Sequence, residues 1–124
     1  MQELIQIKDE ILRKNHLLEK MRAVINKRGL AKSEAIAQYD KMLAINIITL
    51  KNLEKGDSIE WEGKVIKGSV PATSLEKIAK GFCYKVKHEM EKADALYKSA
   101  ITNINTVAAE LNALQSIFRY LDRG

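Results

Sequence analysis

The sequence has little cysteine, proline or aromatic character: one Cys and one Pro among 124 residues, and 6% Phe, Trp and Tyr. The single cysteine, Cys83, excludes an internal disulfide and a zinc site built from several thiolates of one chain. No apolar run approaches the roughly 18 residues that a membrane-spanning helix needs. The shortage of proline and an apolar content of 46% argue against disorder. These shortages leave a single small domain, 1–124, with a modest core.

The N-terminal segment MQELIQIKDEILRK contains acidic residues and no apolar stretch of the kind found in signal peptides. We therefore expect a soluble, cytoplasmic protein without a membrane partner.

Two helical patterns occupy the first part of the chain. Between residues 2 and 27, apolar residues recur at heptad spacing, and Lys14 is the one polar residue on that stripe. Arg28-Gly29 predicts the end of this helix, because glycine accepts the left-handed conformation found just past a C-terminus. A second helical pattern covers residues 32–51. The short connection predicts that the two helices form an antiparallel hairpin.

Residues 57–68 have the pattern of a β-hairpin. Glu62-Gly63 fits a two-residue turn that places Trp61 opposite Lys64, and Ile59 opposite Ile66. Because two strands are not stable alone, the hairpin must rest on the helices or on a second subunit, with Trp61 as its anchor. Two interpretations stay open: a loop held by one buried Trp, and a dedicated binding finger.

A long helical pattern covers residues 74–122 after Pro71. Thr73 and Glu76 have the spacing of a capping box, and Gly81 is a point where a short helix can separate from a long one. Apolar residues then alternate steps of three and four. This stripe includes Tyr97, Ala100, Ile104, Val107, Leu111, Leu114 and Phe118.

The stretch 99–116 contains a single charged residue, Glu110. A solvated helical face normally carries Lys and Glu, so a neutral helix with an apolar stripe indicates contact on more than one side. We predict that this stripe joins subunits of a homo-oligomer; the alternative is a three-helix monomer with a weakly charged surface. The expected fold is mainly α: a helical hairpin plus a long C-terminal helix, in a three-helix bundle or coiled coil, with a small inserted β-hairpin.

No motif for catalysis, metal binding or a cofactor is present. His16 and His88 have no second ligand at metal-site spacing, and Cys83 lacks the sequence context of an activated thiol. We expect no enzymatic activity, no metal and no cofactor.

Basic residues are the remaining signal. Residues 1–32 contain eight Lys and Arg against four Asp and Glu, and a second basic cluster between residues 77 and 92 is interleaved with aromatic residues. Cations neutralise phosphates and aromatic rings stack on unpaired bases, so both clusters permit binding of single-stranded nucleic acid. The candidate binding surface comprises Arg13, Lys14, Lys20, Arg22, Lys27, Arg28, Lys80, Tyr84, Lys85, Lys87 and Trp61.

Three segments carry a resemblance: PATSLEKIAKG at 71–81, MEKADALYKSAI at 90–101 and ELNALQ at 110–115. With them the chain resembles small helical accessory proteins encoded by phages and prophages of Gram-positive bacteria, often near replication and recombination genes. The hairpin at 57–68 departs from the pattern, since such proteins tend to have a short loop there. The resemblance implies a phage accessory protein in the host cytoplasm and supplies no catalytic residues.

Three functions are compatible with these observations. The first is an oligomeric accessory factor that binds single-stranded DNA or a protein of phage recombination or replication. The second is a counter-defence protein that inhibits a host immune effector or sequesters a signalling nucleotide. The third is a structural coiled-coil scaffold.

Overall fold

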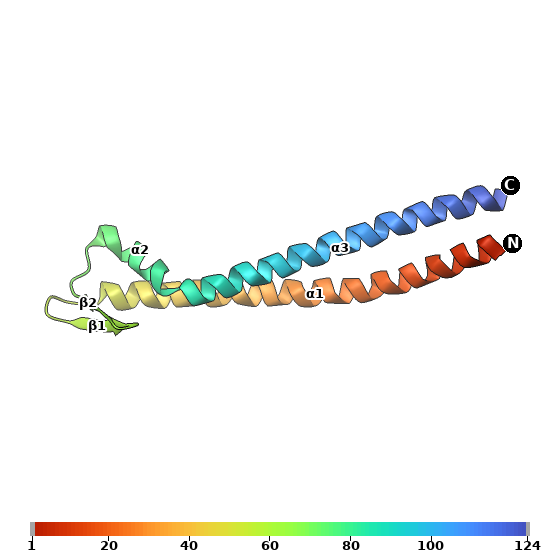
Figure 1. Cartoon of the computed structure of the whole chain (residues 1–124). Helices are drawn as coiled ribbons and strands as arrows, with labels where there is room; N and C mark the ends of the chain where they lie inside the picture. Colours follow the sequence, from red (N-terminus) through yellow and green to blue (C-terminus); the bar gives the residue numbers. More distant parts are fainter. Residues whose placement is uncertain (1, 124) are drawn as a thin grey trace. The chain divides into compact units, whose positions relative to one another are not determined.

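The computed structural model describes residues 2–123 and is mainly helical (Figure 1). Its elements are α1 (Gln2–Lys51), β1 (Ser58–Trp61), β2 (Lys64–Lys67), α2 (Ala72–Phe82) and α3 (Tyr84–Arg123). The predicted fold class is confirmed: helices dominate, the C-terminal helix is long, and a small antiparallel sheet is inserted between helices. No helix within residues 2–123 is both long and apolar enough to cross a membrane.

The chain divides into two compact units, which we describe separately. Unit 1 consists of the described residues up to Ala31 together with those from Asp94 onward, and unit 2 is Lys32–Ala93.

In unit 1, the first part of α1 and the last part of α3 lie side by side and run in opposite directions (Figure 1, red to orange and blue). Leu18, Val107 and Leu111 form the buried core. Ile11 and Ile104 are among the half-buried residues that pack against it. All seven residues of the predicted C-terminal stripe are buried or half-buried. The face that we predicted for contact between subunits therefore lies against α1 of the same chain.

The predicted helix end at Arg28-Gly29 is wrong, because α1 continues as one helix to Lys51. Half-buried positions keep the heptad spacing through this point, at Ile25, Arg28, Lys32 and Ala35. A glycine inside a helix costs about 1 kcal/mol relative to alanine, a cost that tertiary packing can offset. Since no turn separates 2–27 from 32–51, the antiparallel partner of the first segment is α3.

In unit 2, Leu50 of α1, Ala79 of α2 and Cys83 are buried. The side-chain amide of Asn46 lies 3.4 Å from the Ala79 carbonyl oxygen and 3.3 Å from Cys83 Sγ, and donates to both. Cys83 also ends α2. The separation of a short helix from a long one near Gly81 is thus confirmed, with the break two residues later.

The start of α2 differs from the prediction. Pro71 occupies the N-cap position and no side chain caps the helix, so the predicted capping box of Thr73 and Glu76 does not form. The Pro71 carbonyl instead accepts hydrogen bonds from the backbone N–H groups of Ser74 and Leu75, at 3.0 and 3.1 Å. The helix begins at Ala72, which places Thr73 inside the first turn.

The β-hairpin has the predicted register, with Trp61 paired with Lys64 and Ile59 with Ile66. Glu62 and Gly63 both have positive φ values, 47° and 78°, as a two-residue type I′ turn requires. Ile59, Trp61 and Ile66 are half-buried, whereas the alternate residues of both strands are exposed. One face of the hairpin therefore rests on protein.

Candidate binding surfaces

The first candidate surface is a basic row on α1 in unit 1. Arg13, Lys20 and Lys27 recur at every seventh residue, so they share one face of the helix at intervals of about 10.5 Å. All three side chains are exposed. Arg22 is exposed too, but two residues from Lys20 correspond to a rotation of about 200°, which places it on a different face.

Arg13 is partly neutralised by its own helix. Its guanidinium forms a fork with the Glu10 carboxylate, with Nε 3.0 Å from Oε2 and Nη2 bonded to Oε1. The hydrogen bond from Arg13 lowers the pKa of Glu10, and the hydrogen bond to Glu10 raises the pKa of Arg13. Lys20 and Lys27 make no ion pair among residues 2–123, so their charges remain available to a ligand.

Lys14 does not belong to the exposed row. It lies on the apolar stripe of α1 with 16% of its side chain exposed, and its ammonium bonds to the Glu110 carboxylate of α3. Oε1 of Glu10 is 3.8 Å away on the other side. Lys14 therefore connects the two helices of unit 1.

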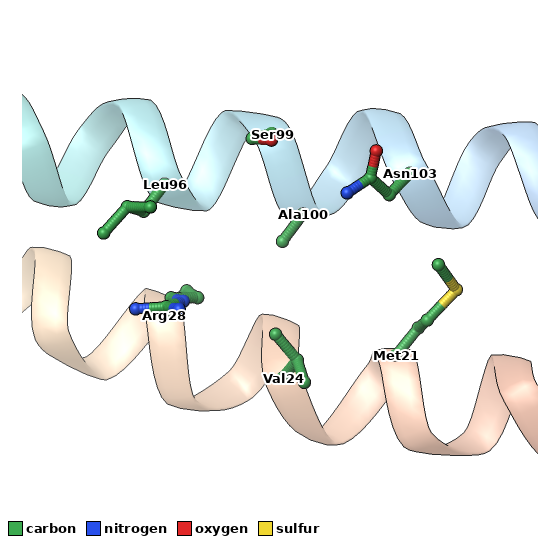
Figure 2. A pocket seen from close by; sticks show the side chains of 7 residues that line it. All are labelled: Met21, Val24, Arg28, Leu96, Ser99, Ala100 and Asn103. Atoms are coloured by element: carbon green, nitrogen blue, oxygen red, sulfur yellow. The ribbon is translucent and has the colours of Figure 1, made fainter.

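Arg28 lines a groove between the same two helices. Figure 2 shows the side chains that line it: Met21, Val24 and Arg28 from α1, and Leu96, Ser99, Ala100 and Asn103 from α3. The groove has a volume of about 270 Å³ and no carboxylate lines it. Arg28 is half-buried and makes no ion pair in the described part of the chain. Its charge is therefore presented to the groove.

The second candidate surface is an aromatic cluster in unit 2. The Trp61 ring centroid lies 4.7 Å from that of Phe82, with a tilt of 32°, and 6.1 Å from that of Tyr84, edge to face. The Tyr84 hydroxyl donates a 2.7 Å hydrogen bond to Glu62 Oε1, which raises the pKa of Tyr84. Lys85 Nζ lies 3.8 Å from the same carboxylate oxygen and 5.7 Å from the centre of the Tyr84 ring.

These contacts fix the hairpin to the junction of α2 and α3. Trp61 is its anchor, as the sequence predicted, and one face of its ring is covered by Phe82. Tyr84 is 46% exposed and is the aromatic side chain of this cluster that a base could still contact.

The other two basic residues of the candidate surface in unit 2, Lys80 and Lys87, differ in whether they form an ion pair. Lys80 forms a 3.0 Å ion pair with Glu76, and this hydrogen bond raises the pKa of Lys80. Lys87 is exposed and has no ion pair within residues 2–123. Lys87 therefore adds an available charge close to Tyr84 in the sequence.

Two features of these surfaces were not predicted: the contacts of Glu62 and the inward position of Arg28. Glu62 was assigned only to the turn. Its carboxylate accepts a hydrogen bond from Tyr84 and lies 3.8 Å from Lys85 Nζ, and nothing in the local sequence indicates these contacts. The inward position of Arg28 could have been found, since it continues the heptad of Ile25 without a shift.

Residues 2–123 contain no group of three or more His, Cys, Asp or Glu side chains placed to hold a metal ion. Comparison of the chain with protein-family models, with curated proteins and with solved structures finds no match.

Proposed function

We propose that this chain is a non-enzymatic accessory protein that acts by binding, with single-stranded DNA or a protein of recombination or replication as its partner. The observation that carries the proposal is the basic row on α1, where Lys20 and Lys27 are exposed and unpaired among the described residues. The resemblance to phage accessory proteins supports the setting, DNA metabolism in a host cytoplasm.

The physical basis is electrostatic. Each cation that neutralises a phosphate releases a condensed counterion, so binding is strong at low salt and independent of base sequence. A helix holds its cations at fixed intervals, which limits the conformational entropy lost on binding. Tyr84, with Lys85 and Lys87 nearby in the sequence, offers a second place where a base can stack beside positive charge.

The test is a fluorescence-anisotropy titration of a labelled single strand at several salt concentrations. Lys20→Gln/Lys27→Gln removes two phosphate contacts and should lower the slope of log affinity against log salt by about 1.4. Lys51→Gln/Lys55→Gln removes the same charge from exposed positions of unit 2 outside both candidate surfaces and should leave the slope unchanged.

Two results would contradict the proposal. One is an equal loss in both double variants, which would indicate attraction to net charge alone. The other is the absence of DNA binding at low salt together with failure to capture purified recombination or replication proteins.

A second candidate function is counter-defence, through a host effector or a signalling nucleotide. The hairpin supports it, since one face is fixed by Trp61 while Val65 on the other face is 58% exposed. Chemical analysis of the protein purified from host cells distinguishes the two: a co-purified nucleotide or effector without DNA binding would favour counter-defence.

A further inference from the structure

α3 has a second row of residues, outside the stripe that contacts α1. From Leu96 to Tyr120 it advances by alternating steps of three and four residues, and every member is exposed. The ends are large and apolar, with Leu96 39%, Ile117 48% and Tyr120 79% exposed. The middle is small or neutral: Ser99, Asn103, Thr106 and Ala113. We call this row the outer stripe of α3.

Charge distinguishes the outer stripe from the other faces of unit 1. Its one charged member, Glu110, is already bonded to Lys14 of its own chain. The exposed row on α1 consists of cations. Another groove of unit 1 is lined by Lys8 and Arg119 and by no carboxylate. Two copies that met through either of those faces would bring unpaired cations together, whereas the one charge on the outer stripe, that of Glu110, is already paired with Lys14.

The outer stripe is complementary to itself in an antiparallel arrangement. Its midpoint lies near residue 108, so a twofold axis there would pair Leu96 with the partner's Tyr120. The same axis would pair Ser99 with the partner's Ile117, and Asn103 with the partner's Ala113. Large side chains then meet small ones or one another toward the ends. In the middle Thr106 would pair with the partner's Glu110, and each Glu110 is bonded to Lys14 of its own chain.

The same twofold axis would place one groove of unit 1 against a different groove of the partner's unit 1. The groove in Figure 2, lined by Leu96, Ser99 and Asn103, would receive the partner's Ile117 and Tyr120. That groove carries the unpaired cation Arg28. The groove at the other end is lined by Glu10, Lys14 and Glu110. Its two carboxylates are bonded to Arg13 and Lys14, so it carries no unpaired cation. Superposing one groove on the other therefore brings the unpaired Arg28 of one copy toward two carboxylates and not toward another unpaired cation.

We infer that a second copy of this chain docks antiparallel on the outer stripe of α3, with Ile117 and Tyr120 of each copy in the Arg28 groove of the other. The dimer is independent of what the basic row binds, because its contacts use other residues. It is therefore tested without nucleic acid.

Sedimentation velocity at tens of micromolar protein should give the wild-type chain twice its 14.0 kDa mass. Ala113→Arg places a bulky cation in the small middle of the outer stripe and should raise the dimer dissociation constant about tenfold or more. Asn112→Arg places the same cation at an exposed position of α3 on a face turned away from the outer stripe, and should remain dimeric. Circular dichroism confirms that both variants keep their helix content.

Crosslinking tests the antiparallel geometry. In Asn103→Cys/Ala113→Cys the two new thiols of one chain are about 15 Å apart along α3. In the dimer, the thiol at position 103 of one copy would lie opposite the thiol at position 113 of the other. A short bismaleimide should therefore yield covalent dimers. Asn105→Cys/Ser116→Cys has a similar separation, about 16.5 Å, at exposed positions turned away from the outer stripe and should not. Cys83, only 1% exposed, stays in both.

Three results would overturn the inference: a wild-type monomer at the highest concentration reached, equal association of the two arginine variants, or equal crosslinking of the two cysteine pairs.

Discussion

Lys14 shows how a single residue can set the pairing of two helices. Its ammonium lies between Glu10 and Glu110 on a stripe that is otherwise apolar. Apolar heptads alone leave a helix pair free to slide by seven residues with little loss of burial, whereas a polar residue on the stripe favours the one register that pairs it. Lys14 thus reduces the apolar burial on the stripe but favours one alignment of α1 and α3 in unit 1.

At the same scale, Tyr84 makes the hairpin sensitive to alkaline pH. Its hydroxyl donates to Glu62, and this hydrogen bond raises the pKa of Tyr84 above its usual 10.0. A raised pKa means that the contact stabilises the fold below the unfolded-state pKa and is lost as the pH rises through the folded one. Ionisation removes the donor and places a phenolate beside a carboxylate.

We therefore expect the fluorescence of Trp61, the one tryptophan of the chain, to change in a step above pH 10. Tyr84→Phe keeps the ring and loses the ionisable hydroxyl, so its titration should lack that step. A step of equal size in Tyr84→Phe would show that another group is responsible.

At the scale of elements, local rules predicted the hairpin and failed at the middle of α1. Glu62-Gly63 allows few alternatives, because a two-residue turn needs positive φ at both positions. Gly29 is compatible with a helix end and with a helix interior. What decides is the heptad phase, which continues from Ile25 through Arg28 to Lys32.

Substitution of Gly29 tests directly whether α1 is one continuous helix. A Cβ atom at this position would lie 3.5 Å from Cε2 of Tyr97, which is ordinary contact. Gly29→Ala should therefore stabilise the protein by about 0.5–1 kcal/mol in urea unfolding, since alanine is the better helix former. Gly63→Ala is the control: with φ at 78°, it should destabilise. Destabilisation by both substitutions would mean that Gly29 does not lie in a regular helix.

For the candidate surfaces too, helix periodicity predicted which residues are exposed, but not which distant residues are in contact. Lys20 and Lys27 are exposed, as their distance from the apolar stripe indicates, while Lys14 is on the stripe in both the sequence and the structure. The contacts of Trp61 with Phe82 and Tyr84 could not be read from spacing, because they join segments about 20 residues apart through tertiary packing.

At the scale of the molecule, the neutral stretch 99–116 has two faces that need separate explanations. The inner face, with Val107 and Leu111, is buried by α1 of the same chain. The outer stripe remains exposed, and among the described residues of unit 1 only three side chains are buried in its core. A helix pair with so little core gains stability from any partner that binds the folded state, and a second copy on the outer stripe would be such a partner.

The dimer also bears on the proposed function, because it would present two basic rows to one DNA strand. Once one row is bound, the second meets the strand at a high effective concentration, so the dimer should bind a long single strand more tightly than a monomer does. Ala113→Arg should lower the affinity about tenfold at concentrations where the wild type is dimeric. Asn112→Arg adds the same charge away from the outer stripe and should not lower the affinity. An oligonucleotide too short to reach both rows separates avidity from damage to the binding face, since all three proteins should then bind alike. Equal affinities on the long strand would mean that one copy of the chain suffices for binding.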